Sequence, residues 1–138
     1  MKLTASGYSG KPLIVKLGIK EGFTIFAMNQ PENYFDILGE LPGEVSVKSR
    51  LSGEMDFIHF FTKDKKELSS NLLNLKKHLN KNGMLWVSWP KKSSKIPTDI
   101  TEDTIREIAL PKGLVDIKVC AIDENWSGLK LVYRLKDR

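Results

Sequence analysis

Residues 23–32 read Phe-Thr-Ile-Phe-Ala-Met-Asn-Gln-Pro-Glu, and they contain the pattern that decides the fold. The run 23–28 is almost continuously apolar, which is typical of a strand buried on both faces of a sheet. Pro31 suits the first turn of a following helix, which Gly39 then ends. A doubly buried strand that leads directly into a helix indicates a parallel α/β sheet.

The chain after this segment repeats the same alternation. Residues 55–61 and 84–89 are two further apolar runs that predict buried strands. Asp64 and Glu67 resemble a capping box, and leucines at helical spacing follow them, so a helix is expected from Asp64 to the Asn82-Gly83 pair. Thr101 is expected to cap a second helix that ends before Pro111.

The ends of the chain add shorter elements. Residues 11–17 predict a short helix that Gly18 stops, and residues 1–10 are expected to be a loose arm. Val45 and Val47 mark a short strand. Residues 114–122 and 129–135 alternate as strands do, and their short connection requires antiparallel pairing.

The predicted fold is therefore a single α/β domain over residues 1–138, Rossmann-like, with a mostly parallel sheet and a C-terminal antiparallel hairpin. This element order resembles the S-adenosylmethionine-dependent methyltransferase fold. The entry Leu17-Gly-Ile-Lys-Glu-Gly22 is also similar to the start of many such domains. The resemblance is to a shortened form, in which one strand–helix unit around residues 40–54 is missing.

The chain also resembles a small family of uncharacterised bacterial proteins. Four stretches carry this resemblance, Gly7-Tyr-Ser-Gly-Lys-Pro-Leu13, Trp89-Pro-Lys91, Gly113-Leu-Val-Asp-Ile-Lys118 and Trp126-Ser-Gly-Leu-Lys130. The family carries no established activity, so the resemblance implies a fold and leaves the function open.

The methyltransferase resemblance implies two cofactor-binding features that this sequence lacks. The turn after the first strand should bear glycine so that the cofactor can approach the backbone, but it reads Asn29-Gln30-Pro31. The second strand should end in an acidic residue for the ribose, but it ends Val47-Lys48-Ser49-Arg50. We therefore expect no bound cofactor, no catalytic residues and no methyltransferase activity.

Cations gather where the strands are expected to end, which is where open α/β sheets bind ligands. The candidate anion or partner site comprises Asn29, Arg50, Lys63, Trp89, Lys91, Lys92 and Lys95. Lys91–Lys95 should form a mobile loop over this edge. An ordinary solvated rim of lysines is the simpler interpretation of the same residues, and we favour it.

The remaining polar candidates favour structural roles. His59 lies in an apolar strand and is expected to be a core or rim histidine, and His78 is expected at the surface. The single cysteine, Cys120, has no partner ligand, so no metal site is predicted. Trp126, in a polar connection, is expected to pack back onto the end of the sheet.

Composition limits the setting of the protein. No apolar run reaches the roughly 18 residues needed to span a bilayer, and residues 1–7 lack an apolar signal core. A lone cysteine fits the reducing cytoplasm. The net charge of +5 permits an acidic partner, but spread over the domain it argues against a nucleic-acid binder.

Three hypotheses follow from the sequence. The first is a non-catalytic binding or interaction domain on a degenerate methyltransferase-like scaffold. The second is a small enzyme with an atypical cofactor or substrate site at the carboxyl edge of the sheet. The third is a weak binder of nucleic acid or of an acidic partner, which would show a steep dependence on salt.

Overall fold

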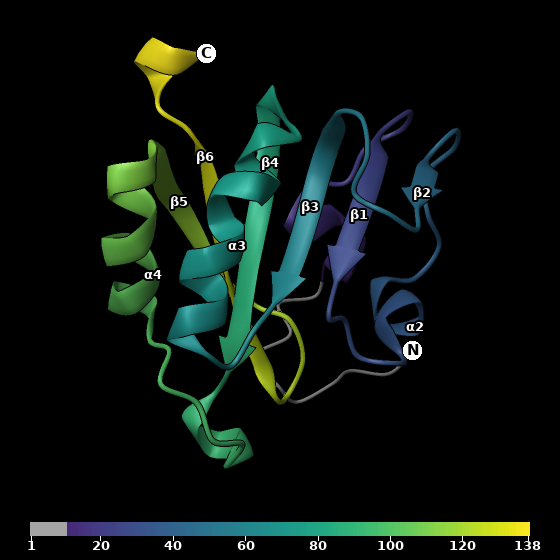
Figure 1. The fold of residues 1–138 in the computed structure, drawn as a ribbon. Helices are drawn as coiled ribbons and strands as arrows, with labels where there is room; N and C mark the ends of the chain where they lie inside the picture. The colour runs from purple at the N-terminus through teal and green to yellow at the C-terminus, as the bar shows by residue number, and fades with distance from the viewer. Residues whose placement is uncertain (1–10) are drawn as a thin grey trace.

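Six strands form one sheet in the order β2-β1-β3-β4-β6-β5 in the computed structural model, which describes residues 11–138 (Figure 1). The strands are β1 Thr24–Met28, β2 Ser46–Lys48, β3 Met55–Phe61, β4 Leu79–Pro90, β5 Leu114–Ala121 and β6 Trp126–Tyr133. The predicted arm of residues 1–10 lies outside the described residues.

The pairing confirms the predicted topology. β1 pairs in parallel with β2 and β3, and β3 pairs in parallel with β4. β6 runs antiparallel to both β4 and β5, so the last two strands form the expected hairpin at one side of the sheet. Only residues 49–54 connect β2 to β3, and they contain no helix, which is where the fold is shortened.

Helices cover both faces of the sheet. The long helices α3 (Lys65–Lys77) and α4 (Glu102–Ala109) lie on the face that Figure 1 presents to the viewer, and the short helices α1 (Leu13–Leu17) and α2 (Tyr34–Leu38) pack on the opposite face. Three short 3-10 turns complete the described chain, η1 Lys92–Ser94, η2 Leu110–Lys112 and η3 Leu135–Asp137.

Two hydrophobic cores lie on either side of the sheet. Leu68, Leu72 and Leu75 of α3 pack on one face, which confirms the helical leucine pattern. Trp86 is fully buried on the other face, while Trp89 is partly buried against the first core. The two indoles point to opposite faces because they are three residues apart on a strand.

The predicted end of α3 was wrong. The helix ends at Lys77 with His78 as its C-cap, and β4 already begins at Leu79. Gly83 lies inside β4, where a Cβ would be 2.8 Å from the carbonyl oxygen of Asp56. The glycine therefore permits a close approach of two backbones and does not stop a helix.

Three other boundaries also differ from the prediction. α2 begins at Tyr34, because Pro31 instead starts a turn in which its carbonyl accepts the Tyr34 N–H at 3.0 Å. β6 begins at Trp126, three residues earlier than expected, and ends at Tyr133. The longer strand extends the hairpin toward the carboxyl end of β4.

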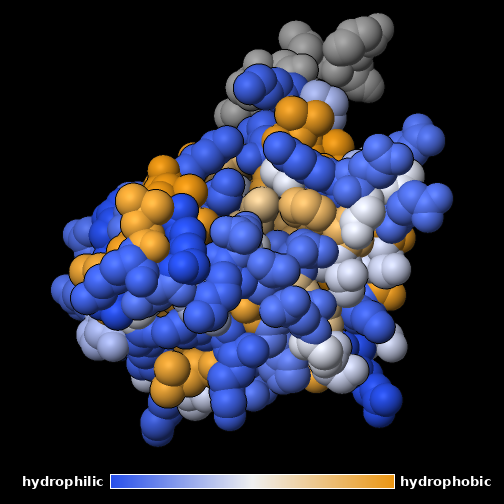
Figure 2. Space-filling view, turned by 90° about the horizontal axis from the view of Figure 1, so that it is seen from above, coloured by the Kyte–Doolittle hydropathy of each residue, from blue (hydrophilic) through white to orange (hydrophobic). Residues whose placement is uncertain are grey.

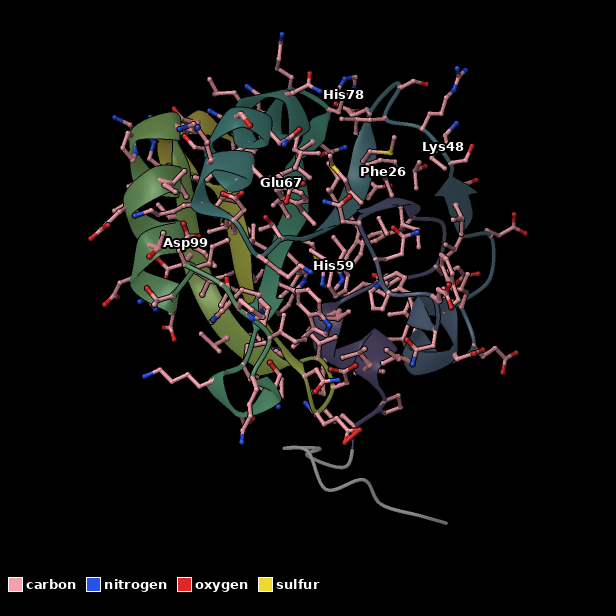
Figure 3. The ribbon with its side chains drawn as sticks, turned by 60° about the horizontal axis from the view of Figure 1, so that its bottom comes forward. Phe26, Lys48, His59, Glu67, His78 and Asp99 are labelled. Carbon is pink, nitrogen blue, oxygen red and sulfur yellow. The ribbon has the colours of Figure 1, made fainter. Side chains whose placement is uncertain are left out.

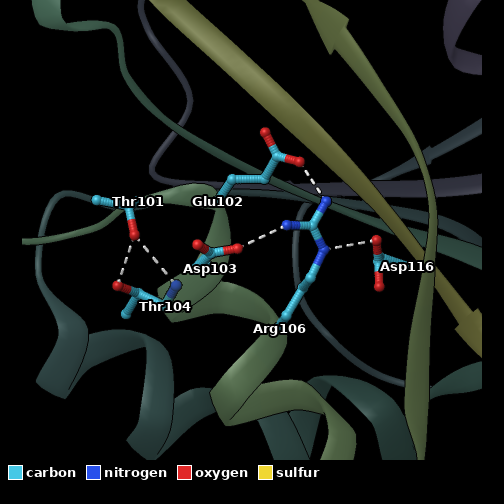
Figure 4. Close-up of polar contacts among 6 residues, drawn as sticks. All are labelled: Thr101, Glu102, Asp103, Thr104, Arg106 and Asp116. Carbon is cyan, nitrogen blue, oxygen red and sulfur yellow. Dashed lines mark hydrogen bonds and ion pairs between the residues drawn. The ribbon is translucent and has the colours of Figure 1, made fainter.

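Arg106 ties α4 to β5 (Figure 4). Its guanidinium donates to Asp116 of β5 at 2.8 Å and to Asp103 at 2.9 Å, and it also contacts Glu102. Hydrogen bonds to Asp116 and Glu102 raise the pKa of Arg106 above its ordinary value. Thr101 caps the helix as predicted, since its hydroxyl accepts the Thr104 N–H at 3.2 Å.

Candidate functional site

The carboxyl ends of the parallel strands meet at one edge of the sheet. β1 ends at Met28, β3 at Phe61 and β4 at Pro90, so Asn29, Thr62 and Lys91 follow them at the same edge. Figure 3 looks toward this edge, with Glu67 and His59 near its centre and Lys48 at the far side, beyond Phe26. Ligands of open α/β sheets bind at such an edge.

A side-chain network bridges the ends of β1 and β3. The Asn29 amide donates to the carbonyl oxygen of Phe61 at 3.2 Å and to one carboxylate oxygen of Glu67 at 3.1 Å. The Thr62 hydroxyl donates to the other oxygen of Glu67 at 2.7 Å. The carboxylate of Glu67 thus joins α3 to the residues that follow β1 and β3. The sequence did not place this carboxylate at the edge.

The turn after β1 depends on Asn29 in a conformation that glycine usually supplies. Asn29 has φ of 60°, in the left-handed region, where asparagine is one of the few residues tolerated. Its side chain then turns back to Phe61 and Glu67. The sequence therefore achieves the tight turn without glycine, but a polar side chain lies over the turn.

The predicted capping box of α3 was half right. Asp64 caps the helix, because its carboxylate accepts the Lys66 N–H at 2.8 Å. Glu67 does not return to the Asp64 N–H, since Asn29 and Thr62 hold its oxygens. The Lys65 N–H is instead satisfied by Asp99, at 2.7 Å. Carboxylates of the chain itself thus occupy the start of α3, where an external anion would otherwise be attracted.

The seven residues of the predicted anion site come from the ends of four different strands, and their acting as one site stays a prediction. Arg50 follows β2, which ends level with Phe26 and therefore two residues short of the end of β1. Lys63 lines a shallow, open hollow with Asp64, Pro97, Thr98 and Asp99, so carboxylates share it. In the part of the chain that the structure describes, none of these lysines forms an ion pair.

The loop after β4 is held by hydrogen bonds at both ends. Residues Lys92–Ser94 form η1, and the Lys91 N–H donates to the Asn125 carbonyl at 2.8 Å. Further along, the Thr98 hydroxyl donates to the Lys63 carbonyl at 2.7 Å. Lys92 and Lys95 are exposed, and the mobility predicted for this loop stays a prediction. Trp89 is half-buried and packs against the core on the α3 and α4 face of the sheet.

His59 is a core residue, as expected, and it joins a buried relay that the sequence did not reveal. Tyr34 Oη lies 2.8 Å from His59 Nδ1, and Ser88 Oγ lies 2.7 Å from His59 Nε2. All three side chains are buried. Burial lowers the pKa of His59 to about 3 and raises the pKa of Tyr34 above its ordinary value.

Aromatic rings close this relay off from the edge of the sheet. Phe61 stacks on the His59 ring with centroids 4.2 Å apart, and Trp126 meets Phe61 edge-on at 5.1 Å. Trp126 therefore packs onto the end of the sheet, as predicted. The relay satisfies buried polar atoms inside an aromatic cluster, which is the structural role expected of a core histidine.

Sequence reasoning missed the roles of Glu67 and Asp99 for different reasons. Glu67 fitted a capping box, which hid its part in the edge network. Asp99 acts across a gap of 34 residues, and no local pattern marks such a contact. Residues 11–138 contain no group of three histidine, cysteine, aspartate or glutamate side chains able to hold a metal ion. These residues also contain no helix long and apolar enough to cross a bilayer.

Substitution of Asn29 tests the edge network. Asn29→Ala should destabilise the protein by about 1–2 kcal/mol, because it removes two hydrogen bonds and places alanine at positive φ. Asn29→Gly should cost less, since glycine adopts this conformation freely. Urea denaturation of both variants measures the difference. A larger loss for glycine than for alanine would contradict the assigned turn geometry.

Comparison with solved structures shows the fold. A ribosomal protein L11 methylase from Lactobacillus delbrueckii subsp. bulgaricus matches with a TM-score of 0.59 at 11% identity, covering 88% of this chain and 75% of that one. A methyltransferase dependent on S-adenosylmethionine from Aquifex aeolicus matches with a TM-score of 0.58 at 17% identity, covering 91% and 90%. The chain thus has a methyltransferase-like fold, as its element order predicted.

Comparison with sequence-family models gives a match to a family whose function is unknown. A family model described as a protein of unknown function, DUF3052, matches residues 39–135. No curated protein matches the chain.

A further solved structure is similar in fold alone. A magnesium protoporphyrin IX methyltransferase from Synechocystis PCC 6803 with bound cofactor matches with a TM-score of 0.57, but at 13% identity, over 88% of this chain and 74% of that one. Such identities carry the fold and not the chemistry.

Proposed function

The chain belongs to the DUF3052 family of proteins of unknown function, and we propose that it uses its methyltransferase-like fold as a non-catalytic binding domain. The observation that carries this proposal is the network at the carboxyl edge. Asn29 and Glu67 lie where the turn after the first strand would have to admit a cofactor. Pro31 further removes one backbone N–H from that turn.

The second strand supports the same proposal. β2 spans three exposed residues and is followed by Ser49 and Arg50. A ribose needs an acceptor for its hydroxyl hydrogens at this place, and the resemblance implies an acidic residue. An arginine only donates hydrogen bonds. Both recognition features of the cofactor are therefore replaced by groups of the wrong shape or charge.

Calorimetry with S-adenosylmethionine and S-adenosylhomocysteine tests the proposal. We expect no heat of binding and no thermal shift, because the turn lacks glycine and the β2 end lacks the acidic residue that the resemblance implies. A ligand present at 100 times its dissociation constant would stabilise the protein by about 2.7 kcal/mol, which a thermal shift detects. A cofactor-dependent methyltransferase measured in parallel serves as the positive control. Micromolar affinity would reverse the proposal in favour of an enzyme.

The burial of Tyr34, His59 and Ser88 supports a role in packing for this relay over a role in catalysis. Ser88 and His59 are hydrogen-bonded as a nucleophile and a base would be, but both side chains are fully buried beneath Phe61. A general base must reach the proton that it abstracts, directly or through one water. The arrangement therefore favours a role in packing, and the partner of the binding domain is to be sought on the surface.

A further inference from the structure

The amino edge of the sheet, opposite the edge described above, gathers chain segments that are distant in sequence. The end of α3, the start of β4, the turn η2 and the end of β6 with η3 all lie at the top of Figure 1. Figure 2 views the molecule from this side, where a mainly hydrophilic surface carries separate hydrophobic patches. Contacts between side chains show that these segments meet.

Several cationic side chains of this edge lie close to Tyr133 and Gly113. The Nζ atoms of Lys76 and Lys81 lie 5.1 and 5.8 Å from the centre of the Tyr133 ring. Lys76 also donates to the carbonyl of Lys112 at 2.6 Å. A Cβ at Gly113 would lie 2.7 Å from Lys76 Nζ and 3.7 Å from the Arg134 guanidinium, so the glycine makes room for both.

We name this surface the amino-edge patch, and its members are cations on four segments: Lys76, Lys77, Lys81, Lys112, Arg134, Lys136 and Arg138. Among the described residues Arg134 alone of these forms an ion pair, with Asp137 at 2.8 Å. Glu54 lies near enough to contribute to the raised pKa of Tyr133, after burial. Cations therefore outnumber carboxylates at this edge, whereas carboxylates are interspersed at the carboxyl edge.

Apolar side chains lie among these cations. Leu135, between Arg134 and Lys136, is 80% exposed, and Leu110, two residues before Lys112, is 51% exposed. Each leucine is the first residue of a short turn at this edge, Leu110 of η2 and Leu135 of η3. Single exposed leucines are common on protein surfaces. Two exposed leucines within a cationic surface offer a partner both apolar contact and charge complementarity.

We propose that the amino-edge patch binds an acidic protein segment that carries apolar side chains between its carboxylates. The carboxylates would meet the lysines and arginines, and the apolar side chains would cover Leu135 and Leu110. This inference goes beyond the proposed function, because it assigns a surface and a class of partner that the loss of cofactor binding does not require.

A nucleic acid fits the same surface less well. Proteins that bind single strands add exposed aromatic rings on which bases stack. The Tyr133 ring is buried and already faces Lys76 and Lys81. A phosphate backbone would also leave Leu135 uncovered. The apolar component of the patch therefore favours a peptide over a polyphosphate.

Fluorescence anisotropy with synthetic probes tests the proposal on the full chain. The probes are a fluorescein-labelled peptide of repeated Glu-Glu-Leu units, the matching Glu-Glu-Ser peptide, and a labelled oligothymidylate. The test variant is Lys77→Gln/Lys81→Gln/Lys136→Gln, whose three lysines are exposed. The control is Lys91→Gln/Lys92→Gln/Lys95→Gln, which removes the same charge from the opposite edge. Urea midpoints confirm that both variants fold.

The Glu-Glu-Leu peptide should bind the wild type more tightly than the other two probes. The amino-edge variant should weaken its binding about tenfold at low salt, because three screened ion pairs contribute a fraction of a kcal/mol each. The control variant should bind like the wild type. Leu135→Ser should weaken binding of the Glu-Glu-Leu peptide and leave that of the Glu-Glu-Ser peptide unchanged.

Four outcomes would overturn the inference. Equal losses in both triple variants would show attraction by net charge alone. A loss confined to the control would place binding at the carboxyl edge, where the sequence predicted it. Tighter binding of the oligothymidylate, indifferent to Leu135→Ser, would identify a polyphosphate surface. Absence of peptide binding would reject the docking surface, and calorimetry with S-adenosylmethionine would still test the proposed function separately.

Discussion

Acidification should destabilise the folded protein steeply, by roughly 4 kcal/mol between pH 6.5 and pH 3, through His59 alone. In the unfolded chain this imidazole takes up a proton near pH 6.5, whereas in the fold it stays neutral until about pH 3. The unfolded state therefore binds more protons in this window. The stability that neutral His59 provides is present above pH 6.5 and is lost as the pH falls.

Urea denaturation at a series of pH values measures this effect. His59→Gln should lower stability at neutral pH, because the bonds to Tyr34 and Ser88 are altered, but its slope with pH should be shallower by about 1.4 kcal/mol per unit. Leu73→Ala, on the exposed side of α3, removes no titrating group and is the control, which should keep the wild-type slope. Parallel pH profiles for the wild type and His59→Gln would contradict the buried neutral histidine.

Truncation of Trp86 should be the most damaging single change in the core. Trp86→Ala should cost about 3–5 kcal/mol, because it leaves a cavity between β4 and α1. It also removes the donor to the carbonyl oxygen of Leu17, which the indole N–H reaches at 2.9 Å. Since whole domains are stable by about 5–15 kcal/mol, this change alone could leave a large fraction unfolded at physiological temperature.

Two companion variants separate the causes of this loss. Trp86→Phe keeps much of the ring volume but leaves the Leu17 carbonyl without its donor, so about 1–3 kcal/mol is expected. Leu73→Ala, on the exposed side of α3, should change stability by no more than about 0.5 kcal/mol. The urea denaturation midpoints of the three variants rank these losses of stability. A Trp86→Ala variant as stable as Leu73→Ala would contradict the packing described here.

The order of elements was predictable because it is written in local patterns. An apolar run such as 23–28 can be satisfied only by burial on both faces, and the leucines at 68, 72 and 75 can share only a helical face. The short connection before Trp126 forces the last strands to pair antiparallel. Connections between parallel strands are right-handed and short, and these two rules allow few arrangements of such elements.

The predicted boundaries and caps were wrong where one residue type can serve two structural purposes. Gly83 has the sequence signature of a helix stop, yet its absent side chain admits the Asp56 carbonyl within β4. Glu67 likewise matched a capping box, yet its carboxylate joins Asn29 and Thr62. In each case the sequence marked the residue correctly, and a contact distant along the chain decided what the residue does.

The sequence by itself determined the fold class, the hairpin and the lack of a glycine-bearing turn after β1, and it limited His59 to the core or its rim. Tertiary structure alone decided the charge of the two edges. Lysines at 76, 81 and 112 come together only when α3, β4 and η2 meet at one end of the sheet. Asp99 reaches the start of α3 only across the folded loop after β4. Charged residues follow no periodic pattern in the sequence that predicts which of them become neighbours in the fold. Solvated side chains gain little free energy from any particular spacing along the chain.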